Sequence, residues 1–320
     1  MQNTLREIAE VIKKVKSATI FTHTRPDGDT LGSGVALYFA LQQLGIQAEV
    51  CNEGDIPQKF FYLAGVEKIV KQPTFDAEAF IAVDCADEKR LGLLEELFIR
   101  KGGRKITVNI DHHISNTCYA KYNYVRETCA NCMNMTQLFS LLGVTLNKEI
   151  ANALYMGLLT DSGNFTHSDV DGEAFRTASS ISDAGADIVT ANYEMFKRQS
   201  KARAALYGAT MSDIRYLLED KLAIIVTTRE MLESCGAAAS DTEGFVDFPL
   251  SVDGVEVCVA MLEVKFRQFK ISLRSKGKVN VNAIAQVFGG GGHILASGCM
   301  IYGDAEEVID RLRYTVSQYM

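Results

Sequence analysis

The 320-residue sequence lacks any uncharged apolar stretch that approaches the ~18 residues needed to span a membrane. Its N-terminal segment also lacks the continuous apolar core of a secretory signal, because six charged side chains interrupt residues 1–16. No internal repeat is present, which excludes collagen-like and low-complexity structure. We therefore expect a cytoplasmic protein without a membrane partner.

Basic residues are not in excess, and cysteines form no disulfide framework. Lys and Arg number 33 against 40 Asp and Glu, and the net charge of −7 argues against a general nucleic-acid coating protein. The eight Cys are scattered through a long chain, which favours reduced thiols. One CxxC pair, Cys129 and Cys132, has no second pair to complete a zinc site, so we favour a structural role over a redox or metal role.

The hydrophobic content of 47% is that of a folded protein and excludes disorder, and the length is typical of roughly two domains. The first half alternates short apolar strands with helical patterns, which predicts βαβ units and a parallel sheet. The predicted strands are 18–22, 48–51, 79–83 and 106–110, and the predicted helices are 5–15, 30–44, 87–99, 131–142, 148–159 and 172–184.

A smaller α+β domain is predicted to follow. We expect domain limits at 1–190, 191–218 for a helical connector, and 219–320. Strands are predicted at 222–228, 255–264 and 269–274, and helices at 281–288 and 305–319. The expected fold class is α/β, with an N-terminal parallel-sheet domain, a smaller α+β C-terminal domain and a site in the cleft between them.

Four short segments at the ends of predicted elements concentrate residues that bind metals. They are the H-x-x-x-D-x-D stretch from His23 to Asp29, then Asp84, then Asp111-His112-His113, and finally Asp161. Carboxylates with a few imidazoles suit Mn²⁺ or a similar ion, and two neighbouring cations need about seven or eight ligand contacts with one carboxylate shared. Three of the five His lie in these segments, a fourth, His293, lies in a glycine-rich motif, and we interpret His167 as structural or exposed. Chance explains that distribution poorly, so we favour a metal pair over four unrelated helix caps.

These motifs, in this order, resemble those of the DHH phosphoesterases, a family named for the Asp-His-His motif that stands here at 111–113. The segment from Phe288 to Gly298 is similar to the G-G-G-H-x-x-A-[SA]-G signature of the family's associated C-terminal domain. The resemblance covers about residues 3–318. The length is similar to that of the stand-alone nanoRNase/pAp-phosphatase branch.

The resemblance implies two Mn²⁺ ions in each active site. One would be held by His23, Asp27 and Asp84, and the other by Asp29, Asp84, His112 and Asp161, with Asp84 as the bridge. It also implies catalytic roles for Asp84, Asp111 and His113. Asp111 would orient a histidine ligand, and His113 would face the scissile phosphate as a donor or as an acid near the leaving group. The implied reaction is in-line attack by a bridging water activated by the two metals.

The second domain is expected to select the substrate. The resemblance implies that Arg274 and His293 contact a terminal phosphate or nucleotide. The substrate-binding residues expected there are Arg274, Gly290, Gly291, Gly292, His293 and Ser297. We interpret most of the lysines around the 269–274 strand as belonging to an ordinary solvated edge strand.

The implied activity is Mn²⁺-dependent hydrolysis of very short oligoribonucleotides and of 3′-phosphoadenosine 5′-phosphate (pAp). Short RNA and small nucleotides are the expected partners, long nucleic acid is not, and a homodimer is a family-level expectation. Hydrolysis of cyclic dinucleotides or of their linear product pApA is the main alternative, because the metal motifs are shared. Pyrophosphatases share these motifs too, but the G-G-G-H segment does not resemble their second domain. A nucleotide-sensing module without turnover is the alternative from a different class.

Overall fold

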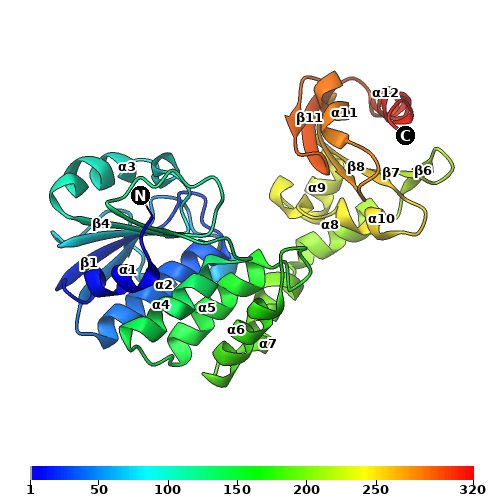
Figure 1. The fold of residues 1–320 in the computed structure, drawn as a ribbon. Helices are drawn as coiled ribbons and strands as arrows, with labels where there is room; N and C mark the ends of the chain where they lie inside the picture. Colours follow the sequence, from blue (N-terminus) through cyan, green and yellow to red (C-terminus); the bar gives the residue numbers. More distant parts are fainter. Residues whose placement is uncertain (1) are drawn as a thin grey trace. The chain divides into compact units, whose positions relative to one another are not determined.

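The computed structural model describes residues 2–320, which form two compact units divided between Arg198 and Gln199 (Figure 1). No helix among the described residues has the length and apolar character needed to cross a membrane. The predicted domain limits stay a prediction. Their proposed connector, 191–218, contains the end of α7 (Ile188–Asn192), a π-helical turn, α8 (Lys201–Met211) and the short strand β6 (Arg215–Leu217).

The first unit is built on a five-stranded parallel sheet, so the predicted α/β fold class is confirmed. The strands run in the order β2-β1-β3-β4-β5. Their bounds are β1 Ser17–Phe21, β2 Gln47–Cys51, β3 Ala79–Val83, β4 Ile106–Asp111 and β5 Tyr122–Val125. The edge strand β5, only four residues long, was absent from the sequence-based prediction.

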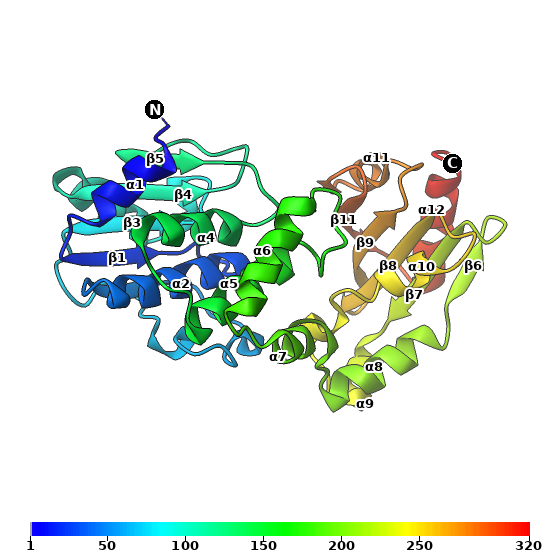
Figure 2. The same cartoon turned by 60° about the horizontal axis from the view of Figure 1, so that its bottom comes forward.

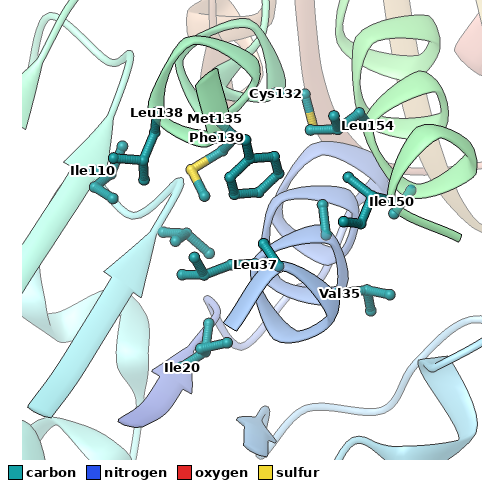
Figure 3. Packing of buried hydrophobic residues seen from close by; sticks show 14 of the residues in the cluster. Ile20, Val35, Leu37, Ile110, Cys132, Met135, Leu138, Phe139, Ile150 and Leu154 are labelled. Atoms are coloured by element: carbon teal, nitrogen blue, oxygen red, sulfur yellow. The ribbon is translucent and has the colours of Figure 1, made fainter. Parts of the chain in front are cut away.

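One face of this sheet is covered by a helical layer. Its members are α1 (Leu5–Ile12), α2 (Gly28–Gln43) and α4 (Asn131–Leu142). Helix α5 (Lys148–Asp161) packs on α2 and α4, and α6 (Gly172–Asp183) packs against α5. Figure 3 shows Leu37 of α2 and Phe139 of α4 against Ile20 of β1 and Ile110 of β4. All four side chains are fully buried. At about 1.5–3 kcal/mol for each large apolar side chain, this layer supplies much of the stability of the unit.

The opposite face has a thinner cover that differs from the prediction. A helix was predicted over 87–99, but the structure has a 3-10 turn at Glu88–Leu91, a single α turn, α3, at Leu94–Glu96, and a π-helical turn at Leu97–Lys101. Gly92 interrupts the helix because its φ of 62° is left-handed, and a Cβ there would overlap the carboxylate of Glu53. Phe98 still packs edge-on against Phe21 of the sheet.

The second unit is a six-stranded mixed sheet in the order β10-β11-β9-β8-β7-β6. Figure 2 shows the strands from β11 to β6 in this order. The further strands are β7 Leu222–Thr227, β8 Val257–Lys265, β9 Gln268–Ser275, β10 Gly291–Gly292 and β11 Ala296–Tyr302. Strand β9 pairs with β8 on one side and β11 on the other, so it is a central strand. The interpretation of this strand as a solvated edge was wrong, because it did not foresee β11 in the glycine-rich segment.

Helices cover both faces of the second sheet. α11 (Val281–Val287) and α12 (Ala305–Ser317) pack on the face that carries Phe269, Ile271 and Leu273 of β9. On the other side lie α8, α9 (Arg229–Cys235) and α10 (Asp247–Ser251). The alternation along β9 therefore sends its polar side chains toward the α8–α10 side.

Candidate metal centre

The carboxyl ends of three adjacent strands carry the polar residues of the candidate site. His23 lies two residues beyond β1, Asp84 directly follows β3, and Asp111 ends β4. Because β1, β3 and β4 are neighbours in a parallel sheet, their carboxyl ends meet at one edge. This edge is where ligands of open α/β sheets bind.

Close packing of α2 against α5 adds Asp29 and Asp161 to this edge. A Cβ at Gly32 would overlap the carbonyl oxygen of Ala153, and a Cβ at Gly157 would lie 2.7 Å from a carboxylate oxygen of Asp29. Larger residues would therefore force the helices apart. Gly32 and Gly157 thus permit the tight packing of the two helices around the site.

The first cluster of possible ligands contains His23, Asp27 and Asp84. Nε2 of His23 lies 3.4 Å from Oδ2 of Asp27 and 3.7 Å from Oδ2 of Asp84. Asp27 is also the N-cap of α2 and accepts a hydrogen bond from the backbone N–H of Thr30. The same turn that starts the helix thus fixes one side of the cluster.

The second cluster contains Asp29, His112 and Asp161. Nε2 of His112 lies 3.5 Å from Oδ2 of Asp161 and 3.9 Å from Oδ2 of Asp29. The same nitrogen lies 3.2 Å from Oδ1 of Asp84, whose Oδ2 faces His23. Asp84 therefore lies between the two clusters. All six predicted ligands are brought together here, and their assignment as ligands stays a prediction.

The start of α4 holds Asp29 in place. The backbone N–H groups of Asn131 and Cys132 each donate a hydrogen bond to its carboxylate, the second at 3.0 Å from Oδ1. The positive end of the helix dipole favours a negative charge at this point. Asp29 is fully buried, so these two donors set the orientation of its carboxylate.

Several buried polar atoms of the clusters have no hydrogen-bond partner within the described residues. They include both ring nitrogens of His23, Oδ1 of Asp84 and Nε2 of His112. Leaving a buried donor or acceptor unsatisfied costs about 1–3 kcal/mol per group, so such atoms rarely gather without a ligand. Imidazole nitrogens and carboxylate oxygens facing a common space fit divalent cations.

The charges of the two clusters are strongly perturbed. Burial, followed by repulsion from Asp84, raises the pKa of Asp29 to about 7. Burial and repulsion from Asp29 raise the pKa of Asp161 to about 9. For His112 burial acts to lower the pKa, but Asp84 and Asp29 outweigh it and raise the pKa to about 10. Carboxylates crowded this closely need protons or cations between them.

The hydrogen bonds of the Asp-His-His motif differ from the expectation that Asp111 orients a histidine ligand. Oδ1 of Asp111 lies 2.8 Å from Nδ1 of His113, the residue expected to face the phosphate. The predicted ligand His112 is instead held by the backbone carbonyl of Thr128, 2.7 Å from its Nδ1. A carbonyl can only accept, so Nδ1 of His112 carries a proton and Nε2 is free to bind a metal.

Two polar residues near the motif were missed by sequence reasoning. Nδ2 of Asn116 lies 2.6 Å from Oδ2 of Asp111 and 2.7 Å from Oδ1 of Asn109, and so fixes the other side of that carboxylate. Arg90 places Nη1 3.4 Å from Nε2 of His113. Asn116 lies three residues beyond the motif, which was a usable signal, whereas nothing local in the sequence connects Arg90 to it.

Cys129 and Cys132 serve the packing of this region. Both are free and buried, and burial raises the pKa of Cys129 to about 12 and that of Cys132 well above its usual value. The thiol of Cys132 packs against the hydroxyl of Ser33 at 3.5 Å. His167, which we interpreted as structural or exposed, is exposed in the structure. Its Nδ1 lies 2.7 Å from the carbonyl oxygen of Asp161.

A cavity of about 390 Å³ opens beside His112 and His113. Arg126 and Glu173 form part of its wall and are joined by two hydrogen bonds of 2.9 and 2.6 Å. Met133 contributes apolar surface to the same wall. The first unit therefore offers room for part of a small ligand next to the candidate metal centre.

In the second unit, Arg274 lines a cavity of about 320 Å³ together with Lys270 and Ser272, all from β9. Phe245 and Glu243 from the loop before α10 form another wall. Neither Arg274 nor Lys270 has a carboxylate partner within 4.0 Å among residues 2–320. Two unpaired cations on one face of a central strand suit an anionic ligand.

The glycine-rich segment forms the β10–β11 hairpin. At two of its positions the backbone leaves no room for a side chain or adopts a conformation that favours glycine. A Cβ at Gly290 would overlap the carbonyl oxygen of Gly298, and Gly292 has φ 150°. Gly291 and His293 are exposed, the latter donating only its backbone N–H to Ala296. Ser297 is buried and its hydroxyl donates to the carbonyl of Val281 at 2.6 Å, so that proton is already used within the fold.

Comparisons with known proteins agree with this architecture. Residues 17–158 match the model of the DHH family N-terminal domain, and residues 226–320 match that of the DHHA1 domain. The chain is 31% identical to the bifunctional oligoribonuclease and PAP phosphatase NrnA of Thermus thermophilus, over 98% of this chain and 94% of the relative. The corresponding Bacillus subtilis protein is 24% identical over 92% and 93%.

A solved structure extends the likeness to three dimensions. The exopolyphosphatase-related protein of Bacteroides fragilis superposes with a TM-score of 0.83 at 25% identity, covering 98% of this chain and 96% of its own. Sequence, domain order and fold thus coincide over nearly the whole length. The chain belongs to the DHH family of phosphoesterases, as the sequence motifs predicted.

Proposed function

We propose that this protein hydrolyses very short oligoribonucleotides and pAp, with two Mn²⁺ ions held by the six clustered side chains. The observation that carries the proposal is the convergence of buried, unpartnered atoms of His23, Asp84 and His112 on three further carboxylates. The activities named for the Thermus thermophilus and Bacillus subtilis relatives support the choice of substrates. A cytoplasmic location and a homodimer stay predictions.

Bound divalent cations would lower the pKa of a water molecule and neutralise charge on the phosphoryl oxygens. The water oxygen attacks phosphorus in line, and the bond from phosphorus to the ribose oxygen breaks with its electron pair. The departing oxygen takes up a proton, which balances the proton lost by water. Because Nδ1 of His113 is engaged by Asp111, Nε2 is the atom that can hold a proton or hydrogen bond at the phosphoryl group.

A turnover panel with added Mn²⁺ tests the proposal. It compares pAp, pApA, a cyclic dinucleotide, RNA of two to five nucleotides, a longer RNA and pyrophosphate, with Asp84→Ala as the control. Turnover of short RNA and pAp with little action on long RNA supports the proposal. Preference for pApA or the cyclic dinucleotide would move the function to second-messenger breakdown. Metal binding without turnover of any substrate would overturn the enzyme assignment.

A further inference from the structure

Arg90 lies close to the first three of the four segments that carry the candidate ligands. Arg90 follows Asp84 by six residues, and its backbone carbonyl accepts a hydrogen bond of 2.9 Å from Thr24, the residue after His23. Its guanidinium reaches the third motif, with Nη1 3.4 Å from Nε2 of His113. The positive charge of Arg90 also helps to lower the pKa of Asp27, a member of the first cluster.

This guanidinium has an unusual set of partners for a half-buried arginine. Other arginines of the first unit, such as Arg126 and Arg198, are paired with glutamates at 2.6–2.7 Å. Among residues 2–320, no carboxylate comes within 4.0 Å of the guanidinium of Arg90, and its one hydrogen bond to a side chain is the long one to His113. Four of its five N–H donors are therefore free of side-chain partners.

We propose that Arg90 is a further catalytic residue, which binds a non-bridging oxygen of the phosphoryl group undergoing hydrolysis. The inference rests on the proposed function. In the proposed function Nε2 of His113 binds the phosphoryl group, so an oxygen bound at that nitrogen would lie beside the guanidinium as well. An arginine fork suits phosphate oxygens, and its fixed charge neutralises the charge that develops during phosphoryl transfer.

A second role for Arg90, the positioning of His113, makes a different prediction. A positioning residue would act only while His113 is present. A group that touches the phosphoryl oxygen would act whether or not His113 is present. A double-mutant cycle between the two residues separates these roles.

The test compares Arg90→Gln and Arg90→Lys with Lys89→Gln, using the full-length Mn²⁺-loaded protein. Lys89 is the matched control because its side chain is exposed and its replacement removes the same charge one residue away. We expect kcat/KM to fall about 100-fold in Arg90→Gln and about 10-fold in Arg90→Lys. Because the scissile phosphoryl group is common to all substrates, the loss should be the same within about threefold for pAp and for a dinucleotide. Lys89→Gln should remain within about twofold of the parent.

A readout apart from turnover uses orthophosphate, a product of pAp hydrolysis. Its dissociation constant, measured by calorimetry, should rise about tenfold in Arg90→Gln and by a similar factor when the substitution is made in His113→Ala. Bound metal and melting temperature should not change. The proposal would be overturned if Arg90→Gln left phosphate binding unchanged, or if it lowered the bound metal content. It would also be overturned if Arg90→Gln weakened phosphate binding only in the protein that retains His113. Failure of the parent to turn over any substrate would instead overturn the proposed function.

Discussion

The two units use polar residues in opposite ways. In the first, Asp29, Asp84 and His23 are at most 2% exposed, and backbone groups or packed helices hold them in place. In the second, Lys270 and His293 are exposed, and the side chain of Arg274 makes one hydrogen bond, to the carbonyl of its own neighbour Leu273. The first arrangement is built for exact placement of charge, and the second for contact with a ligand that arrives from solvent.

This difference predicts where substitutions act. Changes in the first unit should remove metal or lower kcat, because the geometry of the clusters is lost. Changes in the second unit should raise KM and leave bound metal intact, because those side chains hold nothing else in place.

The largest effect is expected for Asp84→Ala. Both clusters lose the carboxylate that lies between them, so we expect kcat to fall more than about 1,000-fold and bound metal to decrease. Turnover and metal content of the purified variant measure this. Activity within tenfold of the parent would show that Asp84 does not serve both clusters.

A smaller loss is expected for Asn116→Ala, which removes the amide that fixes Asp111 opposite His113. Partners of this kind usually contribute about 10–100-fold in activity or metal affinity. We expect kcat to fall within that range while KM changes less than about threefold. Asn116→Asp is the matched variant of equal size, and it should be worse than alanine because it places a second carboxylate against Asp111. A rise in KM as large as the expected fall in kcat would assign Asn116 to substrate binding instead.

Arg274→Ala tests the second unit. Loss of a charged hydrogen-bond donor to phosphate costs about 1.5–3 kcal/mol, so KM should rise roughly 10–100-fold. Kinetics with pAp and metal analysis of the same preparation check this. Lys276→Ala, an exposed lysine that donates to the carbonyl of Val252, is the control for lost charge. A fall in bound metal would contradict the contrast between the two units, since Arg274 would then contribute to metal binding in the first unit.

The chemistry-bearing part of the first unit was largely predictable from sequence. Strands that end in acidic residues and alternate with helices placed His23, Asp84 and Asp111 at one sheet edge, and α4 has the predicted bounds. These features follow from local patterns, because each motif directly continues a strand or helix.

The sequence-based predictions that were wrong concern features set by contacts between distant segments. The central position of β9 is set by β11, a strand formed within a glycine-rich stretch, so the interpretation of β9 as a solvated edge strand was wrong. The partner of Asp111 depends on which histidine ring turns toward it, and the backbone carbonyl of Thr128 decides this by engaging His112. Sequence spacing carries no signal for either choice.

The smallest effect is expected for Glu173→Gln, at the wall of the cavity beside His113. Hydrogen bonds from Arg126 lower the pKa of Glu173 in the folded protein, so its contribution is fully present above the unfolded value of about 4.3 and is lost as pH falls through the folded value. The pair is partly exposed, so we expect only about 0.5 kcal/mol of lost stability at pH 7. Chemical denaturation should show the difference shrinking as the pH falls below the unfolded value and disappearing once Glu173 is protonated in the folded protein as well. A difference that persists in acid would mean that Glu173 acts through packing, and a loss of turnover at pH 7 would mean that this wall contacts the substrate.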